Sequence, residues 1–200
     1  MPISVASPRR LAGIAAPLRA LIRATLALEG LRAGEIGILL THDAALRELN
    51  RRWRGIDRAT DVLSFPYDEP PAAGRSKGRS GTLETPGGQD GRRASRGARR
   101  SQDGGAERVP RSALAPSGRG RPITGDLVIS LDRMAAQARR FRQTQGRELA
   151  RLVVHGALHL SGHDHHRVGE RARMRAAERA ALRAGAAAIA RIERALRTSA

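Results

Sequence analysis

The sequence of 200 residues contains no cysteine, one lysine and only four aromatic side chains. Without cysteine the chain forms no disulfide, has no catalytic thiol and binds no metal through thiolates. No run of about 18 apolar residues occurs, so no membrane-spanning helix is expected, and the first residues lack the apolar stretch and cleavage site of a secretion signal. We therefore expect a soluble cytoplasmic protein without a membrane partner.

Arginine supplies nearly all of the positive charge. Lysine and arginine together number 37 against 19 acidic residues, which gives a formal net charge of +18. Arginine, alanine and glycine share GC-rich codons, so genome composition is one source of this excess. A net charge of this size favours a polyanion as the partner over a cationic substrate.

The composition of the chain changes sharply at residue 68. Residues 68–121 hold 11 of the 22 glycines and five of the ten prolines but no aromatic residue. Such a segment buries too little apolar surface to offset the entropy of ordering it, so we predict a disordered insert. The remaining chain is predicted to comprise a flexible N-terminal tail over 1–9, a single domain over 10–67 and 122–184, and a basic C-terminal helix or tail over 185–200.

Hydrophobic periodicity outside the insert predicts both helices and strands. Helices are expected over 17–29, 44–53, 132–143, 147–160 and 168–184, and strands over 35–40, 61–65 and 126–131. Thr41 or Asp43 is expected to cap the second helix and Asp132 the third. This order indicates an α+β fold, in which helices cover a small mixed sheet and the long insert joins two strands.

Five of the six histidines lie between positions 155 and 166. His155 and His159 are four residues apart on a predicted helix, so their side chains project from the same face. Gly162 then ends the helix, and His163, His165 and His166 compete to return as a third ligand. Three neutral imidazoles at this spacing suit one Zn²⁺ per chain and leave its fourth position for water or substrate.

The spacing of His155, His159 and His165 also matches the metzincin proteases. Those enzymes carry a glutamate directly after the first histidine as the general base, and here that position is Gly156. A metallopeptidase is therefore one alternative. A non-catalytic, zinc-containing ribosome-binding module is another.

Three segments resemble the YbeY family. HGALHLSGHDH at 155–165 resembles the family signature HGxLHLxGYDH, LNRRWRGIDRATDVLSFP at 49–66 resembles a second family block, and GDLVIS at 125–130 resembles a third. The resemblance implies a zinc-dependent endoribonuclease specific for single-stranded RNA, with ribosomal RNA and the small ribosomal subunit as partners and no DNA substrate. It further implies roles in maturing the 3′ end of 16S rRNA and in ribosome quality control.

Carried onto this sequence, the family's zinc ligands fall on His155, His159 and His165, and its functional arginine falls on Arg54. The guanidinium of Arg54 would bind a phosphate through two hydrogen bonds. The sequence departs from the family pattern at His163, where the family has tyrosine, and in the long insert. The nucleophile is left open between a zinc-activated water and the 2′-OH of the RNA.

Several further residues have two interpretations each. Asp164, Glu148 and His163 are candidates to orient a zinc ligand by a hydrogen bond, whereas a surface salt bridge for Glu148 and a helix end for Asp164 are the simpler alternatives. Trp53 and Phe65 are candidates to stack on a base, but we expect them in the hydrophobic core because the chain has so few aromatic residues.

Overall fold

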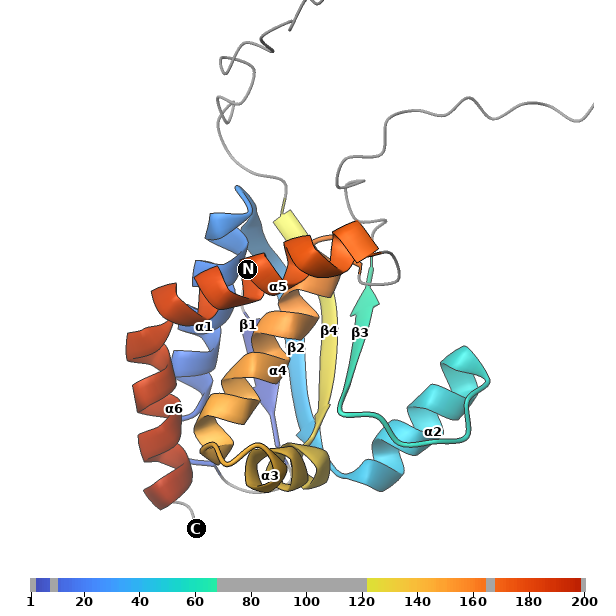
Figure 1. The fold of residues 1–200 in the computed structure, drawn as a ribbon. Coiled ribbons are helices and arrows are strands. Elements are labelled where there is room, and N and C mark those ends of the chain that lie inside the picture. The colour runs from blue at the N-terminus through green and yellow to red at the C-terminus, as the bar shows by residue number, and fades with distance from the viewer. Residues whose placement is uncertain (1–2, 8–10, 68–121, 165–167, 199–200) are drawn as a thin grey trace, which may run out of the picture. The chain divides into compact units, whose positions relative to one another are not determined.

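The computed structural model describes residues 3–7, 11–67, 122–164 and 168–198. Along these residues the elements are β1 (Ile3–Ala6), α1 (Ala15–Leu28), β2 (Arg32–Thr41), α2 (Asp43–Arg54), β3 (Val62–Pro66), β4 (Pro122–Ser130), α3 (Leu131–Arg140), α4 (Gln145–Leu160), α5 (Val168–Ala184) and α6 (Ala186–Thr198). One small mixed sheet packed with helices confirms the predicted α+β fold (Figure 1). The insert predicted over 68–121 lies outside the described residues. None of the helices that the structure describes is long and apolar enough to cross a membrane.

The strands of the described residues form one sheet in the order β1-β2-β4-β3. β1, β2 and β4 run parallel to one another, and β3 runs antiparallel to β4 at the edge of the sheet. β1 corrects the expectation of a flexible tail over residues 1–9, because Ile3 is buried and pairs with Ile36. A strand of four residues is too short to show a clear alternation of apolar and polar positions.

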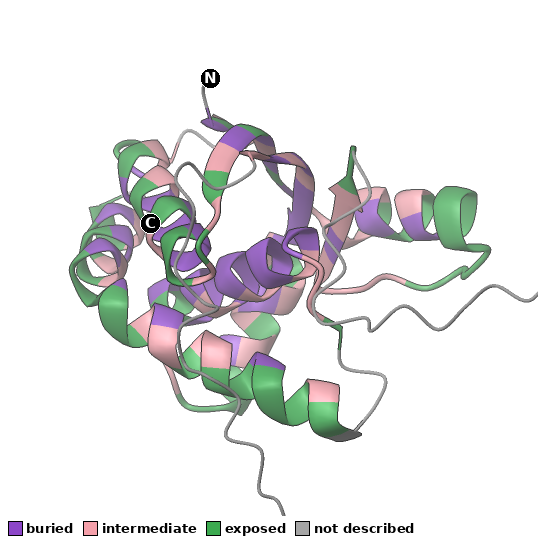
Figure 2. Ribbon diagram, turned by 90° about the horizontal axis from the view of Figure 1, so that it is seen from above, coloured by how far each residue is buried: buried purple, intermediate pink, exposed green. Residues whose placement is uncertain are grey.

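Helices α1, α4, α5 and α6 cover one face of this sheet (Figures 1 and 2). α4 lies at the centre of this layer and contacts α1, α3, α5, α6, β3 and β4. The C-terminal segment, predicted as a helix or a tail, forms α6 and buries Ile192 in the same core. The core is aliphatic, and its largest fully buried side chains include Leu18, Leu21, Ile36, Leu40, Leu127, Ile129 and Leu149.

The starts of α2 and α3 are joined by hydrogen bonds between their first residues. Ser130, not Asp132, caps α3, because its Oγ accepts a hydrogen bond from the backbone N–H of Arg133. Asp132 instead accepts a hydrogen bond from the backbone N–H of Asp43, 3.0 Å away at the start of α2. Asp132 thus stabilises the N-terminus of the neighbouring helix, where unpaired N–H groups favour a carboxylate.

The opposite face of the sheet is covered much less. Of the helices described, α2 alone packs there, with Leu46 against Leu63 of β3 and Val128 of β4. The expectation that Trp53 and Phe65 lie in the core is wrong for Trp53, whose side chain is 64% exposed, and Phe65 is only half-buried at the edge of this small cluster. Aliphatic side chains and two methionines fill the main core of the described residues, to which no aromatic ring belongs.

Candidate active site

Helix α4 presents two of the predicted zinc ligands. Thr144 caps its N-terminus, because Oγ1 of Thr144 accepts a hydrogen bond from the backbone N–H of Arg147, and the apolar face of the helix is buried against the sheet. His155 and His159 lie one turn apart at the partly exposed edge of the helix and line a cavity of about 550 Å³. Gly162, at φ 90°, reverses the chain directly after the helix, a conformation that glycine adopts without strain.

The two imidazoles are arranged as a pair of metal ligands. Nδ1 of His155 contacts Oε1 of Glu178 at 2.6 Å, and Nδ1 of His159 contacts the backbone carbonyl of His163 at 3.0 Å. Since both acceptors are oxygens, each ring in its neutral form carries its proton on Nδ1 and has its lone pair on Nε2. The two Nε2 atoms are 3.2 Å apart. Nitrogen ligands of one tetrahedral zinc ion, each at about 2.0–2.1 Å, are separated by roughly 3.3 Å, so this pair fits zinc.

Glu178 of α5 fixes the orientation of His155. Its carboxylate is largely buried, and burial raises the pKa of Glu178. The hydrogen bond from His155 and the neighbouring positive charge of Arg151 lower it by more, so the pKa lies below its usual value. An ionised carboxylate on Nδ1 holds the ring in position and makes Nε2 more basic, as the partners of metal-bound histidines do.

His163 supports the site through its backbone. Its carbonyl accepts the hydrogen bond from His159, while its own Nε2 lies 2.8 Å from Oε2 of Glu29. The side chain of His163, one of three candidates for the third ligand, therefore pairs with a carboxylate outside the pair of α4 histidines. His165 and His166 lie outside the described residues, and within the described part of the chain no group of three or more metal-binding side chains is formed. His165 stays a prediction.

Arg54 lines the same cavity as His155 and His159. Arg54 is the last residue of α2. The C-cap of this helix is Gly55, which adopts the left-handed conformation with φ 69°. The N–H of Gly55 donates to the carbonyl of Arg51, and this turn sends the chain away from the helix directly after Arg54. Arg54, with its permanently charged guanidinium, and Asp164 thus line one cavity together with the two histidines of α4.

Glu148 is fully buried and belongs to a polar network that reaches the wall of the cavity at Asp61. It accepts hydrogen bonds from Gln143 and, at 2.6 Å, from Arg151, rather than contacting a histidine or forming the surface salt bridge considered above. Arg151 also donates to Gln137, which donates to Asp61 on the cavity wall. Burial raises the pKa of Asp61, but the hydrogen bond from Gln137 and the charge of Arg151 lower it by more, so this carboxyl is held ionised.

Gly156 packs so closely against the sheet that the glutamate of a metzincin protease would displace its neighbours. A Cβ atom at this position would lie 2.8 Å from Cδ2 of Leu127 and 3.3 Å from Oγ of Ser64. The backbone of α4 therefore packs directly on β4 and β3 at the residue where those peptidases carry their general base. Position 156 faces the sheet, with no room for a carboxylate.

The sequence analysis named Arg54, His155, His159 and Asp164 as candidates, and all four line one cavity in the structure. It missed Glu178 and Asp61. Glu178 is 23 residues from His155, on another helix, among alternating arginines and alanines that form no recognisable motif. Asp61 belongs to the block 49–66 that carries the family resemblance, and its position before a strand was the available signal. Both carboxylates act through contacts between distant elements.

A sequence model of the family described as Endoribonuclease YbeY matches residues 11–185. The chain belongs to the YbeY family. A protein named Endoribonuclease YbeY from an Anaeromyxobacter species is 38% identical over 157 residues, which cover 78% of this chain and 57% of that protein. Relatives of the same name from Anaeromyxobacter dehalogenans and Moorella thermoacetica are 37% and 34% identical, covering 75% and 74% of this chain and 53% and 71% of those proteins.

The YbeY match includes every described residue that lines the histidine cavity. The chain spans little more than half the length of the two Anaeromyxobacter relatives.

Proposed function

We propose that this YbeY-family chain is a zinc-dependent endoribonuclease that cleaves single-stranded RNA. One Zn²⁺ per chain is held by His155, His159 and His165, and Arg54 is the catalytic arginine. The substrate is ribosomal RNA on the small ribosomal subunit, where the enzyme matures the 3′ end of 16S rRNA and contributes to ribosome quality control in the cytoplasm.

The observation that carries this proposal is the convergence of two Nε2 lone pairs and one guanidinium on a single cavity. A phosphodiester brings a negative charge that grows on its non-bridging oxygens during cleavage. Arg54 offers two parallel N–H groups to those oxygens. The net charge of +18 attracts the RNA strand to the protein.

Bound zinc would supply a Lewis acid and lower the pKa of a coordinated water or hydroxyl. The residues of the chain set the geometry around it. Glu178 and the carbonyl of His163 hold the Nδ1 protons of His155 and His159, so both rings keep Nε2 turned to the cavity. Arg54 binds and orients the phosphate. The identity of the product ends separates the two nucleophiles, since attack by the 2′-OH leaves a 2′,3′-cyclic phosphate.

The test is cleavage of a labelled single-stranded RNA by the purified zinc-loaded chain. Arg54→Ala should lower the cleavage rate by roughly 10²-fold, on the scale of removing one donor to a developing oxyanion, without loss of zinc. Arg51→Ala is the matched control: it removes the same charge from the same helix, and Arg51 pairs on the surface with Glu48. His159→Ala should remove both zinc and cleavage, and the variants are purified in parallel to expose contaminating ribonuclease.

Casein incubated with the same preparation distinguishes the peptidase alternative. The wild-type chain should leave it intact, because position 156 faces the sheet and carries no general base. RNA cleavage that is equal in the wild type, Arg54→Ala and His159→Ala would overturn the proposal. Casein cleavage that disappears in His159→Ala would replace it with a metallopeptidase.

A further inference from the structure

The edge strand β3 separates two cavities, because its side chains point alternately to the two faces of the sheet. Ser64 and Pro66 line the histidine cavity, whereas Phe65 and Tyr67 line a second cavity of about 620 Å³ on the opposite face. The end of α2 is divided in the same way, with Arg54 in the first cavity and its neighbour Trp53 in the second. The two cavities are therefore a single strand apart.

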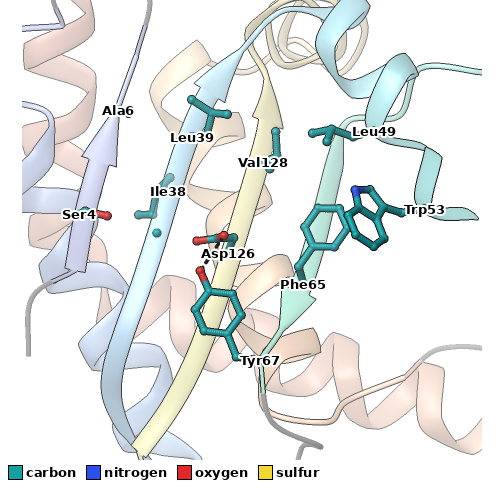
Figure 3. A pocket seen from close by; sticks show the side chains of 11 residues that line it. Ser4, Ala6, Ile38, Leu39, Leu49, Trp53, Phe65, Tyr67, Asp126 and Val128 are labelled. Atoms are coloured by element: carbon teal, nitrogen blue, oxygen red, sulfur yellow. Dashed lines mark hydrogen bonds between the residues drawn. The ribbon is translucent and has the colours of Figure 1, made fainter. Parts of the chain in front are cut away.

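The second cavity gathers three of the four aromatic side chains in the sequence. The rings of Trp53 and Phe65 meet edge to face, with centroids 6.4 Å apart, and Tyr67 lies beside them (Figure 3). Trp53 is 64% exposed and Tyr67 is 59% exposed. Large rings at these exposures contribute little to the core, and a cluster of them marks a binding surface.

The charges around the rings favour a nucleic acid strand over an apolar protein surface. Arg52 lies over the ring of Trp53 at 5.5 Å, and Arg54 follows on the same turn. Arginines beside exposed aromatic rings form the usual surface for single-stranded RNA, in which bases stack on the rings and cations bind the phosphates.

The floor of the cavity is suited to bases and repels phosphates. Asp126 of β4 accepts a 2.7 Å hydrogen bond from the hydroxyl of Tyr67 (Figure 3). The carboxylate of Asp126 lies directly over Gly37 of β2. The Cβ atom of any other residue at position 37 would collide with this carboxylate. A carboxylate accepts hydrogen bonds from the amino groups of bases and disfavours a phosphate at the same place.

We propose that the open face of the sheet is a base-stacking site for single-stranded RNA, formed by Trp53, Phe65 and Tyr67 with Asp126 beside them. Bases adjacent to the scissile phosphate cross the edge of β3 and stack on these rings, while the phosphate stays with Arg54. The site thereby selects unpaired RNA, because bases held in a duplex cannot reach the rings. The inference rests on the proposed nuclease function in one respect, which is the path of the RNA strand from Arg54 to the aromatic rings.

Trp53 is the sole tryptophan of the chain, so its fluorescence reports directly on this face. The probe is a 2′-O-methyl oligouridylate of about 12 nucleotides, which blocks attack by the 2′-OH, and its partner probe is an abasic oligomer of equal charge. The full-length chain is titrated with each. The base-containing oligomer should quench Trp53 and bind the wild type at least about tenfold more tightly than the abasic oligomer does, given the usual contribution of base stacking.

Trp53→Ala and Tyr67→Ala should each weaken binding of the oligouridylate by about five- to 100-fold, measured by anisotropy of a labelled oligomer. Trp53→Phe keeps an aromatic ring and should restore most of the affinity. Phe141→Ala is the matched control. Phe141 is the fourth aromatic residue, is 59% exposed like Tyr67, and lies away from the cavity at the end of α3. Melting temperatures of all variants check that the fold is retained, as expected for rings with little buried area.

Equal quenching by the abasic oligomer, or unchanged binding in both alanine variants, would overturn the stacking site while leaving the nuclease test unaffected. Sedimentation of the same samples adds a further outcome. A dimer that Trp53→Ala dissociates and that RNA does not displace would assign the face to a second copy of the chain. Quenching by the oligouridylate in a chain that cleaves no RNA would retain the stacking site and reject the nuclease.

Discussion

Replacing Glu178 with glutamine keeps the size of the side chain but removes its negative charge. The carboxylate lies 2.6 Å from Nδ1 of His155, and both side chains are largely buried, so solvent screens their interaction only weakly. Partners of this kind typically change metal affinity by about 10- to 100-fold. Glutamine still offers an amide oxygen to Nδ1, so we expect a loss near tenfold for Glu178→Gln and near 100-fold for Glu178→Ala. These losses correspond to about 1.4 and 2.7 kcal/mol.

The assay is competition for zinc between the purified chain and a chromophoric chelator at neutral pH. Glu48→Gln is the control, because it makes the same chemical change on an exposed carboxylate of α2. Circular dichroism of the zinc-free variants separates a loss of affinity from a loss of folding. The reasoning is refuted if Glu178→Ala binds zinc as tightly as the wild type. An equal loss in Glu48→Gln would instead assign the effect to total charge.

Three further predictions follow from the contacts described. His163→Tyr should keep its zinc content by metal analysis, because residue 163 supports the site through its backbone carbonyl; loss of zinc would make the imidazole itself a ligand. Gly156→Ala should lower the stability by about 1–3 kcal/mol in chemical denaturation, because its Cβ would lie 2.8 Å from a methyl group of Leu127; unchanged stability would mean that α4 is free to shift. Asp61 has a lowered pKa in the folded chain, so its stabilising contribution is present above the unfolded pKa of about 3.9 and is lost as the pH falls through the folded value. The difference in stability between the wild type and Asp61→Asn should therefore begin to shrink as the pH falls through the unfolded pKa of about 3.9 and should shrink further toward the lower folded pKa, and a constant difference would contradict the sign.

Local sequence patterns predicted the long elements well. α5 has the expected bounds, and the other helices and strands that were given expected ranges differ from them by a few residues at their ends, whereas β1 was not predicted. Side-chain hydrogen bonds from the residue before the helix cap the starts of α3 and α4 but not those of α1 and α2. Asp132 has the chemistry of a cap but serves α2 instead of its own helix, because Ser130 already accepts the N–H of Arg133.

The candidate site was only partly predictable because it depends on contacts between distant segments. The spacing of His155 and His159 was sufficient to place both on one helix face, and the block around Arg54 placed it in the same cavity. Glu178 carries no local signal, since its role arises only when α5 packs beside α4. The position of Trp53 was mispredicted for a related reason, because aromatic scarcity says nothing about which face of the sheet is covered.

Side chains along β3 alternate between the two faces of the sheet. The number of residues in this strand is therefore more strictly constrained than the identity of each residue. A one-residue slip in pairing with β4 turns every side chain of a strand to the other face. Deleting one residue within Val62–Pro66 would bring an aromatic ring toward the histidines and a serine to the open face, so both surfaces would be lost together. During evolution, β3 can therefore exchange residues of like size and polarity one at a time, whereas insertions and deletions are confined to the segments on either side of it.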